Sequence, residues 1–332
     1  MRGRPVAVLA SGDPFWFGAG GSLGSRLAPE EWRAFPGPST ASLAAARLGW
    51  RLEEVACLGL HAAPFEWLVP VLGNGARMIC LLRDASAPEA LAGWLTAQGF
   101  GSSRLWVLQA LGGPRERITP TRADDFHAPR LETPVAVAIE AAGQAGLART
   151  PGLEDGMFAS DGQITKAPIR ALTLSALAPR AGETLWDIGA GSGSISVEWA
   201  LAAGGCTALA IEPRADRCRN IKENAARFGL THRITICPGM APAALDGLPP
   251  PNVVFVGGGA SRHLMETLWQ RLSPGTRLVA NAVTLETEAL LLDLHALHGG
   301  RLLRCEIAQS RPLGRMRGWE PSRPITQWSV TR

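Results

Sequence analysis

A glycine-rich run between two apolar segments constrains this chain more than any other feature. The run TLWDIGAGSG, residues 184–193, has the pattern of a strand, a tight turn and the start of a helix. A second apolar segment ends in Glu212, 25 positions after Asp187, about the length of one helix and one strand in a βαβ unit. Glycine at 189, 191 and 193 lets a ligand approach the backbone, because glycine has no Cβ and adopts positive φ easily. Since the carboxylate of Glu212 can accept both hydroxyls of a ribose, the pattern predicts a nucleoside-binding site.

Three interpretations of this run are open. A dinucleotide site has the spacing GxGxxG and places a pyrophosphate at the helix N-terminus. Here the spacing is GxGxG with an acid before the first glycine. This resembles the first motif of class I S-adenosylmethionine methyltransferases, whose cofactor has no phosphate, and it favours that cofactor over NAD. The third interpretation is a turn without a ligand, although three glycines at a strand end are costly without a use.

Length and composition narrow the class of protein. The 332 residues suggest two domains, and 46% hydrophobic residues are enough to bury two cores. No uninterrupted apolar run of 18 residues is present, so we expect no transmembrane helix. The N-terminal apolar run predicts a strand rather than a signal peptide. The six cysteines have no CxxC or metal-ligand spacing, so we expect no metal site, reduced thiols and a cytoplasmic location.

The net charge of +4 comes from 31 arginines and only two lysines on the basic side. Arginine pairs with carboxylates and phosphates in bidentate fashion, although a GC-rich genome would also enrich arginine together with alanine and glycine. No basic run is long enough to indicate nucleic-acid binding. We therefore expect neither a nucleic-acid partner nor a membrane partner.

Strand-like and helix-like segments alternate along the chain, which predicts an α/β fold. In the first part we predict a buried strand at 5–11 before the turn SGDP, further strands at 76–83, 103–111 and 134–141, and helices at 42–49 and 86–100. In the second part we predict a helix at 164–179, strands at 184–188, 207–212, 233–237, 252–258 and 276–281, helices at 194–203, 216–228, 261–272 and 284–298, and a C-terminal hairpin.

Several motifs of the second part occur together: GMFASDGQITKAPIRALTLSALAP, WDIGAGSGSISVEWA, FVGGG, NAVTLETEALLL and PLGRMRGWEPSRPITQW. In this order they resemble the decarboxylating precorrin methyltransferase domain of cobalamin biosynthesis. The resemblance implies a class I, Rossmann-like methyltransferase domain over 141–332. It also implies that this domain methylates C-15 of a precorrin with S-adenosyl-L-methionine and removes carbon dioxide from the C-12 acetate.

The same resemblance implies which residues contact the cofactor. The loop Gly189, Ala190, Gly191, Ser192 and Gly193, with Asp187 before it, lines the methionine and ribose, and Glu212 holds the ribose hydroxyls. Thr165 reaches the cofactor from the preceding helix. Met240 and Ala241 lie beside the adenine; many methyltransferases have an aspartate at the position of Met240, so here the adenine amine is left to backbone groups.

Substrate contacts are expected at the rim of the sheet, where α/β proteins bind ligands. Asn281, Thr284 and Glu286 follow a predicted strand and face the substrate, or else Thr284 caps the next helix. Trp319 stacks on the flat macrocycle, or else it belongs to a core or an interface. No catalytic residue is singled out, because an electron-rich ring carbon does not require a strong protein base.

The first part contains LASGDPFWFGAGGSL, FPGPSTASLAAARLGW and LGGPRERI. These motifs resemble the class III tetrapyrrole methylases, which implies such a domain over 1–140 with a cofactor cleft lined by Gly12, Asp13, Pro14, Ser39 and Thr40. In that family a strand, a glycine-rich loop and a helix come before the SGDP strand. Because SGDP follows Met1 so closely here, we expect the N-terminal part of this domain to be missing and methylation at C-5 to be impaired.

The two domains in this order are typical of bifunctional precorrin methyltransferases. The expected partners are S-adenosylmethionine, a precorrin tetrapyrrole and other copies of the chain in a homo-oligomer. Two alternatives stay open: another S-adenosylmethionine-dependent methyltransferase acting on a small molecule or RNA, and a non-catalytic scaffold that retains the fold.

Overall fold

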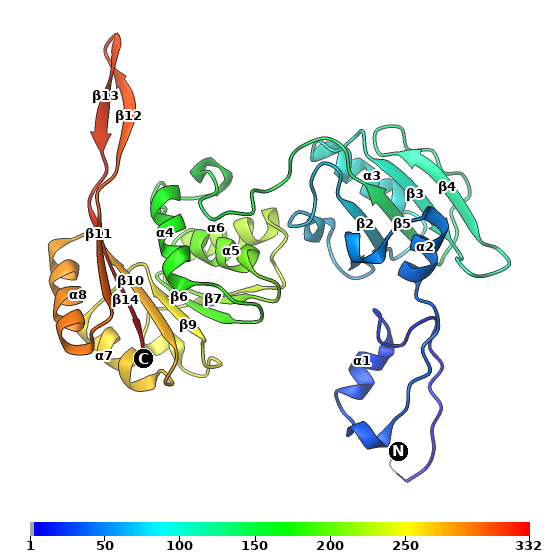
Figure 1. Cartoon of the computed structure of the whole chain (residues 1–332), viewed down its shortest axis with the longest axis horizontal. Coiled ribbons are helices and arrows are strands. Elements are labelled where there is room, and N and C mark those ends of the chain that lie inside the picture. Colours follow the sequence, from blue (N-terminus) through cyan, green and yellow to red (C-terminus); the bar gives the residue numbers. More distant parts are fainter. Residues whose placement is uncertain (1–2) are drawn as a thin grey trace. The chain divides into compact units, whose positions relative to one another are not determined.

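The computed structural model describes residues 3–332 and divides the chain into two compact units (Figure 1). Unit 1 is Met1–Leu147 and unit 2 is Ala148–Arg332. Each unit has its own sheet and its own buried apolar cluster.

Unit 1 is built on a five-stranded mixed sheet. Its strands, in spatial order, are β1 (Val55–Gly59), β2 (Arg77–Leu81), β5 (Val135–Glu140), β3 (Arg104–Gln109) and β4 (Arg117–Arg122). Strands β1 and β2 are parallel, and the other neighbours are antiparallel. The helices are α1 (Ala19–Gly24), α2 (Thr40–Leu48) and α3 (Ala87–Ala97). The predicted α/β alternation is therefore confirmed in this unit.

Helices α2 and α3 cover opposite faces of this sheet. Ala44 of α2 packs with Ile79, whereas Leu91 of α3 packs with Met78 and Cys80. Neighbouring residues of a strand point to opposite faces, so the central strand β2 is covered on both sides. This explains why its apolar run is continuous rather than alternating.

The prediction of a strand at 5–11 is wrong. The segment has no regular structure and pairs with no strand of the sheet. Val6 and Val8 are more than half exposed, and Leu9 is 97% exposed. An apolar run predicts a strand only if a neighbouring strand is available to receive its backbone hydrogen bonds. In the described part of unit 1, neither edge strand of the sheet, β1 or β4, pairs with this run.

Unit 2 contains a seven-stranded sheet. In spatial order its strands are β11 (Arg301–Cys305), β14 (Ile325–Thr331), β10 (Arg277–Ala282), β9 (Val253–Val256), β6 (Thr184–Ile188), β7 (Thr207–Glu212) and β8 (Ile234–Pro238). The strands from β10 to β8 are parallel, and β14 runs antiparallel to both of its neighbours. This is the strand order of a class I methyltransferase, as predicted.

Helices cover both faces of this sheet (Figure 1). They are α4 (Ala167–Leu177), α5 (Ser194–Ala202), α6 (Ala215–Arg227), α7 (Arg262–Arg271) and α8 (Leu285–His298). Leu268 of α7 and Leu291 of α8 pack with Trp186 and Val254 of the central strands. The predicted helix at 164–179 is shorter than expected. It begins at Ala167, because Pro168 occupies the first turn, where a proline loses no helical hydrogen bond.

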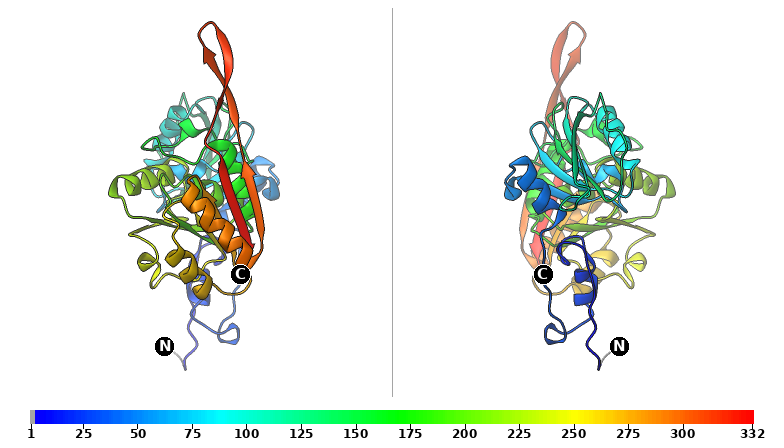
Figure 2. Two further views of the ribbon diagram at one scale, coloured as in Figure 1. Left: turned by 90° about the vertical axis from the view of Figure 1, so that its left-hand side faces the viewer. Right: turned by 90° about the vertical axis from the view of Figure 1, so that its right-hand side faces the viewer.

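The predicted C-terminal hairpin is confirmed, and it extends beyond the edge of the sheet. Strands β11 and β14 pair within the sheet, and beyond them β12 (Ala308–Leu313) pairs with β13 (Met316–Pro321) in a separate two-stranded ribbon. This ribbon, here called the arm, projects away from the sheet in the views of Figures 1 and 2. Five short 3-10 turns complete the structure: Pro29–Glu31, Leu52–Glu54, Phe65–Leu68, Asp155–Met157 and Ala243–Leu245.

Candidate functional site

The glycine loop joins β6 to α5 at the carboxyl edge of the unit 2 sheet. Gly189, Gly191 and Gly193 all have positive φ, at +70°, +60° and +73°. A Cβ on Gly189 would lie 2.7 Å from the carbonyl oxygen of Gly258, in the loop that follows β9. A Cβ on Gly191 would meet nothing within 4 Å. The loop is therefore tight against β9 on one side and open beside Gly191, where a ligand could lie against the backbone.

Glu212 ends β7 beside this loop and is 2% exposed. Its Oε2 accepts a hydrogen bond from the Gly191 N–H at 2.9 Å, and its Oε1 accepts one from the Arg214 N–H at 3.0 Å. A carboxylate has about four acceptor positions, so two are left for hydroxyl groups of a ligand. The Glu212 carbonyl accepts from Gly239 at 3.2 Å. This contact places Met240 and Ala241 next to Glu212; the Met240 side chain is 71% exposed.

Asp187 lies beneath the loop and is 1% exposed. Its Oδ2 accepts from the Ser196 N–H at 3.1 Å and from the Ser196 hydroxyl at 2.6 Å, which fixes the first turn of α5. Its Oδ1 is buried without a hydrogen-bond partner. Burial, with a smaller contribution from the nearby charge of Glu212, raises the pKa of Asp187 to about 6, although the hydrogen bonds from Ser196 oppose this shift. Asp187 therefore connects the end of β6 to the first turn of α5 across the glycine loop.

Thr165 lies outside the helix in which we expected it. It is in an irregular segment before α4, half-buried, and its carbonyl accepts a hydrogen bond from the guanidinium of the buried Arg170. The prediction that Thr165 belongs to the helix is wrong, because the helix begins two residues later at Ala167. Its segment is nevertheless connected to the glycine loop, since the Asn224 amide bonds both Ala159 and Ser192. Asn224 could not be predicted from the sequence, because a single asparagine within a helical pattern gives no spacing signal.

Of the three residues expected near the substrate, Asn281 lies in a hydrogen-bond network within unit 2, and Thr284 and Glu286 lie at the start of α8. The Asn281 amide is half-buried and donates to Thr173 at 2.9 Å, while its oxygen accepts from Gln327 at 2.9 Å. Thr284 caps α8 by accepting from the Thr287 N–H at 3.3 Å, as the alternative interpretation predicted. Glu286 is exposed in the first turn of the same helix.

Trp319 lies on β13 of the arm and is 77% exposed. This rules out the prediction that it belongs to the core of unit 2. The arm also exposes Leu313 at 69% and Met316 at 75%. Three large apolar side chains are therefore presented to solvent on one short ribbon.

In unit 1 the structure brings together the two motifs of the expected cleft. The Gly12 carbonyl accepts from the Gly37 N–H at 3.2 Å, and a Cβ on Gly12 would lie 3.1 Å from the Pro38 carbonyl. The Asp13 side chain accepts a hydrogen bond from the Phe15 N–H at 2.8 Å, which closes a turn around Pro14. Ser39 caps α2 by accepting from the Ser42 N–H at 3.1 Å, and Thr40 is the first helical residue.

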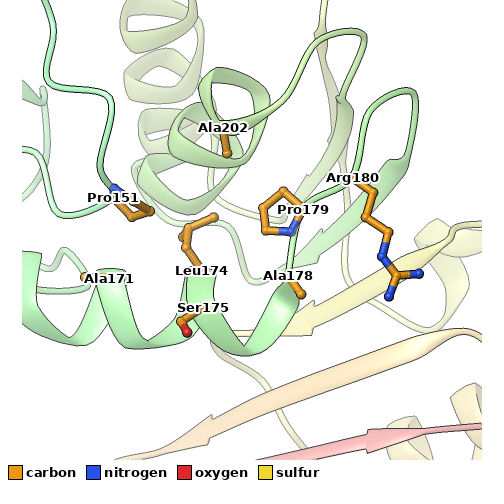
Figure 3. Close-up of a pocket in the computed structure, with 8 residues that line it drawn as sticks. All are labelled: Pro151, Ala171, Leu174, Ser175, Ala178, Pro179, Arg180 and Ala202. Atoms are coloured by element: carbon orange, nitrogen blue, oxygen red, sulfur yellow. The ribbon is translucent and has the colours of Figure 1, made fainter.

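A hollow in unit 2 lies away from the glycine loop (Figure 3). It is lined by Pro151, Ala171, Leu174, Ser175, Ala178, Pro179, Arg180 and Ala202. Pro179 and Arg180 precede β6, and Ala202 ends α5, so this hollow is at the amino edge of the sheet. It is therefore separate from the loop at the carboxyl edge.

Within the described residues, 3–332, two kinds of feature are absent. No group of three or more histidine, cysteine, aspartate or glutamate side chains is placed to hold a metal ion. No helix in the same range has both the length and the apolar character needed to cross a membrane.

The strand order, the glycine loop and the acid at the end of β7 define a class I methyltransferase unit. The chain matches two family descriptions: "Precorrin methyltransferase domain" over residues 156–332 and "Tetrapyrrole (Corrin/Porphyrin) Methylases" over residues 1–127. In a Sinorhizobium species, a precorrin-6Y C(5,15)-methyltransferase (decarboxylating) is 50% identical over 100% of this chain and 81% of that protein. A Mycobacterium tuberculosis protein of the same name is 42% identical over 99% of this chain and 83% of its own length.

A solved structure is also similar. The C-terminal domain of precorrin-6Y C5,15-methyltransferase from Rhodobacter capsulatus is 61% identical, with a TM-score of 0.55 over 56% of this chain and 100% of that chain. The chain therefore belongs to the precorrin-6Y C(5,15)-methyltransferase (decarboxylating) family. It is an S-adenosylmethionine-dependent methyltransferase.

Proposed function

We propose that this enzyme methylates C-5 and C-15 of a precorrin tetrapyrrole and removes carbon dioxide from its C-12 acetate, in cobalamin biosynthesis. Residues 141–332 form the domain that methylates C-15 and decarboxylates. Residues 1–140 form the tetrapyrrole methylase domain for C-5. The observation that carries the proposal is the glycine loop whose Gly191 amide and Glu212 carboxylate meet at the carboxyl edge of the sheet.

The residues at this edge fit S-adenosylmethionine. When bound, that cofactor supplies an electrophilic methyl group on a sulfonium. The free acceptor positions of Glu212 would hold the ribose hydroxyls, and the open side of Gly191 leaves room for the cofactor against the backbone. Met240 and Ala241, beside Glu212, would border the adenine. Asp187 keeps the loop in place from below.

The chain's main contribution to the reaction is position. An in-line displacement needs the methyl group and the nucleophilic ring carbon to be held close together, with water excluded. The conjugated macrocycle can take up the electron pair that the C-12 acetate leaves when its carboxylate departs as carbon dioxide. No protein base is required for either step. Asn281 would face the substrate from the end of β10 and Glu286 from the first turn of α8, whereas Thr284 caps that helix. Trp319 would stack on the macrocycle.

The unit 1 site is proposed to bind a second cofactor molecule at Gly12, Asp13, Pro14, Ser39 and Thr40. The hydrogen bond from the Gly37 N–H to the Gly12 carbonyl, which brings the two motifs together, supports this site.

The chain is further proposed to form a homo-oligomer. The exposed apolar residues of the arm support this, because large apolar side chains clustered on a surface mark interaction sites. We also propose a cytoplasmic location without a nucleic-acid partner. All six cysteines are free thiols, as a reducing compartment would keep them.

Titration calorimetry with S-adenosylmethionine tests the cofactor site. Glu212→Gln replaces an acceptor with an amide that presents N–H groups to the N–H of Gly191 or Arg214. We expect the dissociation constant to rise at least about tenfold, which is about 1.4 kcal/mol. The matched control is Glu223→Gln, an exposed acid on α6 that pairs only with Arg227 among the described contacts. The proposed site is wrong if Glu212→Gln binds as tightly as the control.

A further inference from the structure

An irregular segment, residues 152–166, runs along α4, α5 and α6 of unit 2. We call this segment the strap. It includes Thr165, the residue expected to contact the cofactor, and it has no strand partner. Its backbone is held instead by side chains of the three helices.

The first anchor is a buried ion pair. Arg170 of α4 is 0% exposed, and its Nε donates to Glu198 of α5 at 2.5 Å. The Glu198 carboxylate also accepts from the N–H groups of Gly152 at 2.6 Å and Leu153 at 3.0 Å. The Arg170 guanidinium donates further to the carbonyls of Leu153 and Thr165 and to Asp155 at 3.1 Å. Both ends of the strap are therefore tied to one buried pair.

A second anchor holds the middle of the strap to α6. Arg217 forms an ion pair with Asp161 at 2.9 Å and also donates to the Gln163 side chain. Arg227 donates to the Met157 carbonyl at 2.8 Å. These three contacts are at or near the surface and join α6 to the strap, without a bond to the glycine loop.

Asn224 differs from both anchors because it touches the strap and the cofactor loop together. It is 0% exposed. Its Oδ1 accepts from the Ala159 N–H at 2.8 Å, and its Nδ2 donates to the Ala159 carbonyl at 2.9 Å and to the Ser192 carbonyl at 2.8 Å. One planar amide thus makes a two-way bond with the strap and a third bond with the loop. Both Nδ2 hydrogens are used.

We propose that Asn224 is a positioning residue for the cofactor: its amide holds the Ser192 carbonyl and the strap backbone at Ala159 in one arrangement, so that the glycine loop and the strap carrying Thr165 are ordered together. This inference depends on the proposed function, in which the loop holds S-adenosylmethionine. Binding at the loop then orders the strap, and a strap fixed in advance strengthens binding at the loop. Such coupling is reciprocal.

Because the Asn224 amide both donates and accepts hydrogen bonds, substitutions can remove its donor and acceptor roles separately. Asn224→Asp keeps the size and the acceptor for the Ala159 N–H, but it places a carboxylate oxygen against the carbonyls of Ala159 and Ser192. Asn224→Ala removes all three bonds. The matched control is Arg227→Gln, on the same helix, which loses a bond to the strap carbonyl of Met157 but none to the loop.

The experiment measures binding of S-adenosylhomocysteine by calorimetry on the full chain. For both Asn224 variants we expect the dissociation constant to rise at least about tenfold. We expect kcat at saturating S-adenosylmethionine to stay within about threefold and KM for the cofactor to rise. Arg227→Gln should bind like the wild type. Folding of each variant is checked by circular dichroism at the temperature of the titration.

Hydrogen exchange supplies a second measurement that a merely structural role would not change. In the wild type, S-adenosylhomocysteine should slow exchange of strap amides near Ala159 as well as loop amides. In the Asn224 variants it should slow exchange in the loop alone. If the variants do not fold, the wild type alone tests the inference. The inference is overturned if S-adenosylhomocysteine does not slow exchange of the strap amides in the wild type.

The failures are distinguishable. If the wild type does not bind S-adenosylhomocysteine, the proposed cofactor site fails and the inference fails with it. If the wild type binds, and the folded Asn224 variants bind within twofold of it with the strap still protected, Asn224 is only a structural residue and the inference alone is overturned.

Discussion

At the scale of single residues, two buried carboxylates under one loop have different tasks. Glu212 points to the loop amide of Gly191 and keeps acceptor positions for a ligand. Asp187 points to the start of α5 and supports the loop. The sequence predicted that both belong to the site, because their spacing matches one βαβ unit. It could not divide the tasks between them, since this depends on which N–H groups each one faces.

Asp187 gives a prediction on the pH dependence of stability. Burial raises its pKa to about 6 in the folded state, whereas an unfolded aspartate titrates near about 4. Between these values the folded state binds the proton and the unfolded state does not. The contribution of Asp187 to the free energy of unfolding therefore falls as the pH rises through this window, by up to about 3 kcal/mol, and the loss is complete above about pH 6.

Asp187→Asn removes this titration and keeps an oxygen that can accept from Ser196. We expect the variant to gain stability relative to the wild type as the pH rises from about 4 to about 6, and the gap to be constant above that window. Urea unfolding of both proteins at several pH values measures the gap. A gap that does not change with pH would show that Asp187 does not titrate in this range.

The role of Asn224 could not be predicted from the sequence. The amide connects Ala159 and Ser192, which are 65 and 32 positions away in the chain. Only the packing of α6 against the loop and the strap places them together. An asparagine within a helix otherwise indicates only a mildly unfavourable residue, so no pattern in the sequence singles it out.

At the scale of elements, the parallel strands of unit 2 were the most predictable part. Each is a short apolar run that is followed by a helical pattern, and all the predicted strands and helices of this sheet are present. Strands β1 and β4 of unit 1 were missed. Strand β4 contains Pro120, which is tolerated because β4 is at the edge of its sheet. For the segment 5–11 the error is the opposite one: a strand was predicted where none is present. The apolar character of a short run does not show whether another strand pairs with it.

The arm carries the prediction at this scale. Leu313, Met316 and Trp319 are exposed on a ribbon that projects from the sheet (Figure 2). If Leu313 and Met316 form the contact between copies of the chain, replacing both with serine, with Trp319 left for the substrate, should lower the mass of the particle in light scattering. The free energy of unfolding within unit 2 should change little, because surface substitutions are usually within about 0.5 kcal/mol.

The control for the arm is Leu297→Ser, an equally exposed leucine on α8, at 74% exposure. It should leave the particle mass unchanged. A wild type that is monomeric, or an arm variant with the mass of the wild type, would contradict the proposal that the arm joins the subunits.

At the scale of the whole molecule, two units with separate cores correspond to two proposed methylations. The Rhodobacter capsulatus C-terminal domain that resembles unit 2 was crystallised as a domain, and all of it is covered by this chain. The sequence predicted two domains from the motifs on either side of residue 140, and the proposed boundary lies close to the division between the units at Leu147. Which unit performs which methylation depends on chemistry that neither composition nor spacing can report.

The most direct test of the central claim is the mass of the product that the full chain forms from its precorrin substrate and S-adenosylmethionine. The wild type should form a product that has gained a methyl group at C-15 and lost carbon dioxide from the C-12 acetate. Glu212→Ala, with the unit 1 site untouched, should form neither change at a detectable rate. A Glu212→Ala enzyme that methylates C-15 and decarboxylates at the wild-type rate would contradict the assignment of this chemistry to the glycine loop of unit 2.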